Sequence, residues 1–461
     1  MATSAELKQN ILNGGYDQAF AKLYGADTAT VAAQRVRYVD MIDHFEENFG
    51  TGRTVCLYSA PGRTEIGGNH TDHQHGHVLC GSVDLDMLAT EIGGNHTDHN
   101  NGVVIAAAVN LDIIAVVAKN DENVVRVISH GFGKIDDVNL RDLTPQPVEA
   151  EHSASLIRGV AAGIVKDGGK VGGFDCYTTS DVLGGSGLSS SAAFEVCMGA
   201  IFRGEYNDND MKRFDQVKNA MISQYAENVF FGKPCGLMDQ TACAVGKVIT
   251  IDFKEVGHPV VREVPFDLAA KGFALCISDT KGSHADLTDD YAAVRREMES
   301  VAEFFGKKVL RDVDEETFLK AIPEVRKVTG DRAVVRAIHF YNDSRRAGEI
   351  YEAIKADDFD RFLQLIIEGG HSSFEFNQNA YSIKNPQEQG VPLALAISQK
   401  VLNGRGAWRL QGGGFAGTIQ AFVPLALLET YKNAIDAVFG AGSCHVLSVR
   451  NYGAVMVTPD M

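Results

Sequence analysis

The segment "VLGGSGLSSSAAFE" (182–195) limits the possible fold and chemistry of this chain more than any other. Its three glycines let the backbone bend and approach a ligand closely, and its three serines lead into an apolar helix. Free N–H groups and the dipole at a helix N-terminus favour a bound anion. The spacing is neither that of a G-x-x-x-x-G-K-[ST] loop nor that of a dinucleotide fingerprint. A serine-capped turn is the plainer interpretation, but three serines after G-x-G-L favour an anion-binding loop.

Length, composition and charge exclude several classes of protein. A chain of 461 residues, 45% hydrophobic and 22% charged, can bury a large core and usually forms more than one domain. The net charge of −17 disfavours nucleic acid and anionic membranes as partners. Asn110 and Asp112 interrupt the longest apolar run, which we interpret as paired strands rather than a membrane span. Eight cysteines without C-x-x-C, and no signal-peptide pattern, indicate a cytoplasmic protein with reduced thiols.

Strand-like and helical patterns alternate along the chain without a low-complexity linker. A helical pattern covers 27–49, and strand-like runs follow at 53–60 and 102–120. The pattern restarts near residue 268 with a strand-like run and long amphipathic helices. We therefore predict an α+β fold with two domains, 1–265 and 266–461.

Two further glycine-rich segments have possible chemical roles. "GKPCGLMDQ" (232–240) ends with Asp239, which follows Glu227 by 12 residues. A carboxylate in such an apolar setting is either hydrogen-bonded structure or a working base, and on its own the structural role is favoured. The glycines of "RLQGGGFAGTIQAF" (409–422) predict either a tight hairpin or close approach of the backbone to a ligand.

Taken together, the order "APGR…HTDH", "GLSSSAAFE", "GKPCGLMDQ", "GGGFAGTIQ" resembles the GHMP small-molecule kinases and, within them, the galactokinases. The resemblance extends from about residue 55 to 449. It implies transfer of phosphate from ATP to the anomeric hydroxyl of a galactose-like sugar. It also implies an N-terminal domain of the ribosomal-S5 type and a C-terminal ferredoxin-like domain, with the site between them.

The resemblance assigns roles to individual residues. Asp239 would be the base or orienting acceptor for the sugar hydroxyl, and Arg63 would stabilise charge at the reacting oxygen. Ser191 and Glu227 would hold Mg²⁺. The sugar-binding residues would be Asn69, His70, Asp72 and Tyr291. The ATP phosphates would contact Gly185, Ser186, Gly187, Leu188, Ser189, Ser190 and Ser191.

The chain departs from the family signature G-R-x-N-x-x-G-E-H-x-D-Y, because Glu65, Asn69 and His73 replace the asparagine, the glutamate and the tyrosine. An amide at position 69 can donate a hydrogen bond and has no charge. Galactose remains the favoured substrate, with galacturonate or another galactose-like sugar as the alternative. A non-catalytic sugar sensor that binds a transcriptional regulator is a further alternative. The intact serine run, Glu227 and Asp239 favour an enzyme.

The signature stands in a tandem duplication. "TEIGGNHTDH" occurs at 64–73 and again at 90–99, and the similarity continues to residue 115. Either copy one or copy two (Asn95, His96, Asp98) can fill a single sugar pocket. Arg63 directly precedes copy one, so we favour copy one and expect 77–102 to bulge from the surface. The clustered histidines also allow a transition-metal site, which we consider the weaker interpretation.

Overall fold

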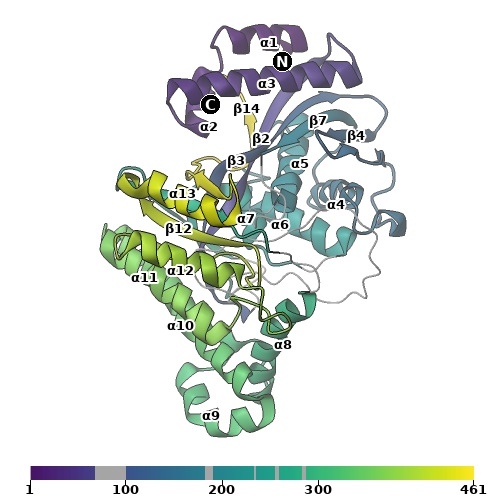
Figure 1. Cartoon of the computed structure of the whole chain (residues 1–461). Coiled ribbons are helices and arrows are strands. Elements are labelled where there is room, and N and C mark those ends of the chain that lie inside the picture. Colours follow the sequence, from purple (N-terminus) through teal and green to yellow (C-terminus); the bar gives the residue numbers. More distant parts are fainter. Residues whose placement is uncertain (1, 68–99, 182–189, 233–234, 255–258, 283–286) are drawn as a thin grey trace.

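The computed structural model describes residues 2–67, 100–181, 190–232, 235–254, 259–282 and 287–461 (Figure 1). Within these ranges the chain forms a ten-stranded sheet and a four-stranded sheet, both flanked by helices. This confirms the predicted α+β class. Among the described helices, none combines the length and apolar character needed to cross a bilayer.

The strands of the described chain divide between the two sheets. The first sheet contains β1 (Ala2–Thr3), β2 (Thr54–Gly67), β3 (Val103–Lys119), β4 (Val124–Ser129), β5 (Gly133–Lys134), β6 (Val138–Asn139), β7 (Phe174–Ser180), β8 (Val248–Asp252), β9 (Val260–Val264) and β14 (Val455–Val457). The second contains β10 (Phe273–Asp279), β11 (Ala407–Leu410), β12 (Thr418–Pro424) and β13 (Cys444–Leu447). The α-helices are α1 (Ser4–Leu12), α2 (Asp17–Tyr24), α3 (Thr28–Phe49), α4 (Ser153–Lys166), α5 (Ser190–Tyr206), α6 (Gln216–Tyr225), α7 (Met238–Val245), α8 (Thr288–Phe304), α9 (Glu315–Thr329), α10 (Asp331–Lys355), α11 (Phe359–Ser372), α12 (Gly390–Leu402) and α13 (Leu428–Phe439).

Strand β3 is the central strand of the first sheet. It pairs with β2, β7 and β8, and the run that we expected to be paired strands is one 17-residue strand. The polar residues that interrupt this run are satisfied rather than turned out of the sheet. Asn110 exchanges hydrogen bonds with Ser448, at 3.1 and 2.9 Å. Asp112 accepts from Arg37 Nη1 at 2.8 Å and from Arg450 Nη1 at 2.7 Å.

The two faces of β3 pack against different helical layers, as period-2 alternation requires. Ile114 and Val116 lie in a core with α1, α2 and α3. Ala115 and Val117 lie in the large core that includes α4, α5 and α7. Figure 1 shows α1–α3 as a separate layer, with both chain termini beside it. The long β3 therefore supports cores on both sides.

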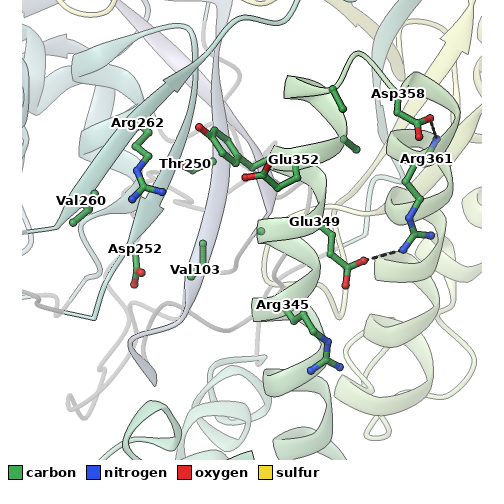
Figure 2. Close-up of a pocket in the computed structure, with 14 residues that line it drawn as sticks. Val103, Thr250, Asp252, Val260, Arg262, Arg345, Glu349, Glu352, Asp358 and Arg361 are labelled. Atoms are coloured by element: carbon green, nitrogen blue, oxygen red, sulfur yellow. Dashed lines mark hydrogen bonds and ion pairs between the residues drawn. The ribbon is translucent and has the colours of Figure 1, made fainter.

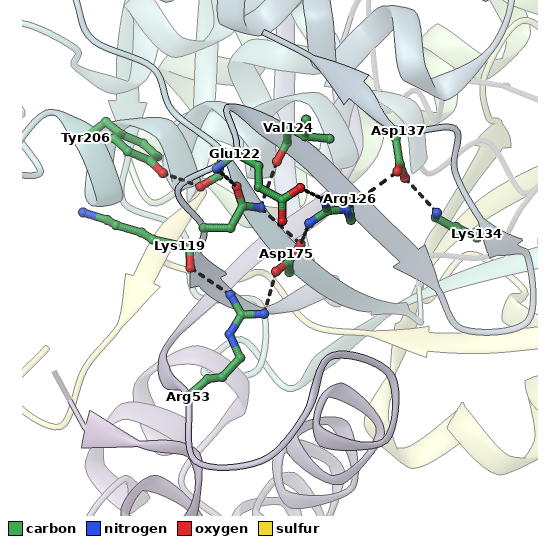
Figure 3. A network of polar contacts seen from close by, with 11 residues as sticks. Arg53, Lys119, Glu122, Val124, Arg126, Lys134, Asp137, Asp175 and Tyr206 are labelled. Carbon is green, nitrogen blue, oxygen red and sulfur yellow. Dashed lines mark hydrogen bonds and ion pairs between the residues drawn. The ribbon is translucent and has the colours of Figure 1, made fainter.

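A polar network links the residue before β2 to β3, β4 and β7 (Figure 3). Arg53 donates to Asp175 Oδ2 at 2.5 Å and to the Lys119 carbonyl at 2.8 Å. Arg126 and the side chain of Asn120 donate to Asp175 Oδ1 at 3.1 and 3.2 Å. Asp175 is 4% exposed and has two arginine partners, so its charge is compensated where the strands meet.

The chain crosses from the first sheet to the second between β9 and β10, near the predicted boundary at residue 265. Its last strand, β14, returns to the first sheet and pairs antiparallel with β2. The sequence pattern did not indicate this return. The division into two independent domains stays a prediction.

The duplication is divided between two strands. The first residues of copy one, Thr64 to Gly67, continue β2 directly after Arg63 and pair with β3. The C-terminal part of copy two, from Val103 onward, forms most of β3. The expected surface bulge 77–102 is wrong at its last three residues. Asn100 is fully buried and accepts from Leu310 N at 2.9 Å, and the Gly102 carbonyl accepts from Phe253 N at 3.2 Å.

Candidate active site

Arg63 and Asp239 form a buried ion pair between β2 and α7. Arg63 follows a register shift in the pairing of β2 with β3, and Asp239 lies in the first turn of α7. Arg63 Nε and Nη2 lie 2.7 and 2.6 Å from the same oxygen, Asp239 Oδ1. Arg63 is 0% exposed and Asp239 5%. These charge-assisted contacts hold the carboxylate in a fixed orientation.

A second set of carboxylates lies beside this pair. Glu227, on a π-helix (Ala226–Phe231) that continues α6, and Glu195, on α5, are both buried. Gln240 follows Asp239 in α7, and its Nε2 donates to Glu227 Oε2 at 2.7 Å and to Glu195 Oε2 at 3.2 Å. One amide therefore links helices α5 and α7 to the π-helix that carries Glu227.

Cys243 shows that these charges converge. It lies one turn after Asp239 in α7 and is fully buried. Burial raises the pKa of the Cys243 thiol well above its ordinary value; the charge of Arg63 lowers it, and those of Asp239 and Glu195 raise it further. Three charged side chains thus act on one thiol, which places Glu195 in the same electrostatic environment as the Arg63–Asp239 pair.

Tyr291, on α8, is held by the hairpin between β11 and β12. Its hydroxyl donates to the Gly414 carbonyl at 2.8 Å, and its ring lies at 86° to that of Phe415, with centroids 5.3 Å apart. A Cβ at Gly413 would meet the ring at 2.3 Å, so the ring requires glycine there. The glycines of 409–422 therefore form a hairpin and also admit close approach, by the Tyr291 ring. Contact of Tyr291 with a sugar stays a prediction.

The helix predicted after the serine run begins at Ser190, so Ser190 and Ser191 lie in the first turn of α5. The other ATP-loop residues, Gly185 to Ser189, lie outside the described residues. The same holds for the sugar-binding candidates of both copies: Asn69, His70, Asp72, Asn95, His96 and Asp98.

Sequence reasoning missed Glu195 and Gln240. Two signals could have found them. Glu195 follows Ser191 by four residues on a helix, the spacing that places two side chains on one face. Gln240 is a polar residue that directly follows Asp239 at the end of the glycine-rich segment 232–240.

A large cavity lies elsewhere in the molecule. It has a volume of about 600 Å³ and opens between β8, β9 and the helices α10 and α11 (Figure 2). Arg262 and Asp252 line one wall, and Glu349 and Arg361 line the other. Arg63, Asp239, Glu227 and Tyr291 are not among its lining residues, so cavity size does not identify the catalytic centre.

Two models of known families match the chain. The galactokinase galactose-binding signature matches residues 43–90 and again 89–119, one match for each copy of the duplication. The GHMP kinase N-terminal domain matches 155–247. The match to the GHMP kinase N-terminal domain contains Glu195, Glu227, Asp239 and Gln240.

The chain is similar to curated galactokinases over most of its length. The chain is 33% identical over 397 residues to the galactokinase of Actinobacillus pleuropneumoniae serotype 5b, covering 85% of this chain and 91% of that protein. It is 30% identical over 395 residues to the galactokinase of Glaesserella parasuis, with the same coverage. Among solved structures, Lactococcus lactis galactokinase complexed with galactose has a TM-score of 0.72 at 20% identity, covering 91% of this chain and 99% of that one. A mevalonate kinase has a TM-score of 0.55 at 12% identity, covering 85% and 98%. The chain belongs to the galactokinase family of GHMP kinases.

Proposed function

We propose that the protein is an ATP-dependent kinase that phosphorylates galactose at the anomeric hydroxyl. The observation that carries this proposal is the buried Arg63–Asp239 pair, which joins β2, within the galactose-binding signature match, to α7, within the GHMP kinase match. Phosphoryl transfer needs positioning and charge compensation more than covalent catalysis. A fixed carboxylate and a fixed arginine supply both.

Asp239 orients the sugar hydroxyl and accepts its proton as the oxygen attacks the γ-phosphorus. Arg63 compensates the charge of Asp239 through two contacts to Oδ1 and stabilises negative charge at the reacting oxygen. Both side chains are more than nine-tenths buried, and the low dielectric strengthens their electrostatic effect on a bound substrate.

The donor set fits Mg²⁺ on the ATP phosphates. Glu227 is a buried carboxylate that accepts a hydrogen bond at 2.7 Å from the neutral amide of Gln240, and a bound cation would compensate its charge. Mg²⁺ is usually held by one or two carboxylates together with phosphates and water. Ser191 would add a hydroxyl from the first turn of α5.

Copy one is the proposed sugar-binding copy, through Asn69, His70 and Asp72. The continuity of β2 from Arg63 into Gly67 supports this assignment, because the first residues of copy one extend the strand that carries Arg63. Tyr291 is proposed to close the other side of the sugar. Asn69 leaves room for a sugar that carries its own carboxylate, because no acidic side chain at that position repels it.

The test is a coupled assay of ADP release with four sugars: galactose, galacturonate, glucose and N-acetylgalactosamine. We expect the highest kcat/KM with galactose. A higher kcat/KM with galacturonate would show that the proposed substrate is wrong, whereas the proposed mechanism would still apply. Binding of galactose and ATP without ADP release would identify a sensor and contradict the proposal.

A further inference from the structure

Gln240 lies between two buried carboxylates that belong to different elements. Its Nε2 is 2.7 Å from Glu227 Oε2 and 3.2 Å from Glu195 Oε2. Gln240 is 1% exposed, Glu227 2% and Glu195 0%. Because both carboxylate oxygens can only accept from Gln240, the amide must turn its NH₂ group toward them. Its Oε1 is buried and, within the described part of the chain, accepts no hydrogen bond.

This arrangement constrains Glu227 directionally. A carboxamide has two N–H donors in one plane, about 120° apart. The Gln240 NH₂ group faces Glu227, Glu195 and, at 3.5 Å, Cys235 Sγ, so its contact with Glu195 limits the directions open to the donor that faces Glu227. Glu195 is on α5 and Gln240 on α7, two helices that pack against each other. Residues on α5 and α7 therefore orient the Glu227 side chain of the π-helix.

We propose that Gln240 is a positioning residue, anchored by Glu195, which aims the Glu227 carboxylate at the nucleotide-bound divalent cation. The proposal rests on the proposed role of Glu227 as a cation ligand. It gives the residue after Asp239 a separate role, since Asp239 acts on the sugar hydroxyl and Gln240 acts on the cation through Glu227. Because the two residues are adjacent in α7, one helical turn fixes both.

The test measures Mn²⁺ binding to the enzyme–ADP complex by electron paramagnetic resonance, together with the thermal midpoint of unfolding. In Gln240→Glu the donor becomes a third carboxylate. We expect Mn²⁺ affinity to fall about tenfold or more, because Glu227 loses a hydrogen bond to its charged form. Gln240→Leu should show the same direction of change. Gln224→Leu is the matched control: Gln224, on α6, donates to the Cys235 carbonyl at 3.0 Å, and its loss should leave Mn²⁺ affinity unchanged.

A double variant separates positioning from packing. Glu195→Gln combined with Gln240→Glu exchanges the amide and the carboxylate, so the hydrogen bond between positions 195 and 240 is restored while Glu227 still lacks its donor. We expect the thermal midpoint to recover relative to Gln240→Glu and the Mn²⁺ affinity to stay low. Recovery of both together would overturn the proposal, as would wild-type Mn²⁺ affinity in Gln240→Leu.

The outcome also distinguishes the inference from the proposed function. If Glu227→Gln leaves Mn²⁺ affinity unchanged, Glu227 is not a ligand and the inference is overturned with it. If the affinity pattern is as expected but galactose is not phosphorylated, the inference stands and the proposed substrate is wrong.

Discussion

Arg63 and Asp239 are separated by 176 positions in the chain and meet through two contacts to one oxygen. The sequence identified both, because each belongs to a motif whose residues carry the family resemblance. It assigned no role to Glu195 and Gln240, although both stand in those motifs, because the contact between them spans 45 positions and only the fold brings them together. At this scale, local spacing could point to candidate residues but not to the contacts between them.

Asp239→Asn keeps the shape of the side chain and removes its charge. We expect turnover to fall about a hundredfold or more, as is typical for loss of a general base, with ATP affinity close to wild type. Steady-state kinetics and calorimetric titration with a non-hydrolysable ATP analogue measure the two quantities. Asn is preferable to Ala, because Ala would also remove the oxygen that accepts from buried Arg63. Near wild-type turnover would remove Asp239 from the mechanism.

Glu227→Gln tests whether Glu227 is a ligand of Mg²⁺. The amide is nearly isosteric with the carboxylate but brings no charge to a hard cation. We expect the Mg²⁺ concentration for half-maximal rate to rise, with KM for the sugar little changed. A magnesium titration at saturating galactose and fixed ATP measures this shift. An unchanged titration would mean that Glu227 serves only the packing of its helix.

Among the elements, the extent of α3 followed from helical periodicity, and the start of β2 from the strand-like run at 53–60. Strand β3 was interpreted as two strands because Asp112 interrupts it. In the structure, side chains from α2, α3, β2 and the segment after β13 converge on Asp112. No local pattern contains that information.

Asp112 makes the stability of this region dependent on pH. Burial acts to raise its pKa, but the charges of Arg37 and Arg450 and hydrogen bonds from Ser59 and Tyr24 outweigh burial and lower the pKa below its ordinary value. A lowered carboxyl pKa stabilises the fold above the unfolded value, about 4, and this contribution is lost as pH falls through the folded value.

We therefore expect Asp112→Asn to lower the free energy of unfolding by about 3–5 kcal/mol at pH 7, because two arginines lose a buried counter-charge. The difference from wild type should shrink below about pH 4. Urea unfolding at both pH values measures it. Asp181→Asn is the control: Asp181 lies 3.0 Å from Arg37, but its side chain is 51% exposed, so we expect about 1 kcal/mol or less. Equal effects of the two variants would contradict this account of the cluster.

For the whole molecule, the duplication defines the sharpest question. The described fold uses the front of copy one in β2 and the back of copy two in β3. Removing 64–89 and removing 74–99 give the same amino-acid sequence, because the decamers are identical. Removing 77–102 gives a chain of the same length that differs only by Gln and His in place of Asn100 and Asn101.

We expect the chain without 74–99 to retain activity and to unfold at an equal or higher temperature. The shorter connection between β2 and β3 lowers the entropic free-energy cost of closing the loop by on the order of 1 kcal/mol. The chain without 77–102 should be less stable by about 1–3 kcal/mol, because the longer glutamine overfills the buried Asn100 site. Calorimetric melting of the two deletions measures this difference. Equal midpoints would show that the Asn100 contacts to Leu310 and Met298 do not matter.

Deletion cannot identify the copy that binds sugar, but single substitutions can. Asp72→Ala should abolish phosphorylation, and Asp98→Ala should leave it near wild type, because copy one continues from Arg63 in register. The measurement is kcat/KM for galactose in each variant. The reverse pattern would assign the sugar to copy two.

The central claim is transfer of phosphate to the anomeric oxygen of galactose at the Arg63–Asp239 pair. Phosphorus NMR of a reaction with galactose, ATP and Mg²⁺ tests it most directly, because coupling between phosphorus and the proton on C1 reports where the phosphate is bound. The account predicts galactose 1-phosphate from the wild type and almost none from Asp239→Asn in the same time. Inorganic phosphate as the sole product, or phosphate on another hydroxyl, would contradict it.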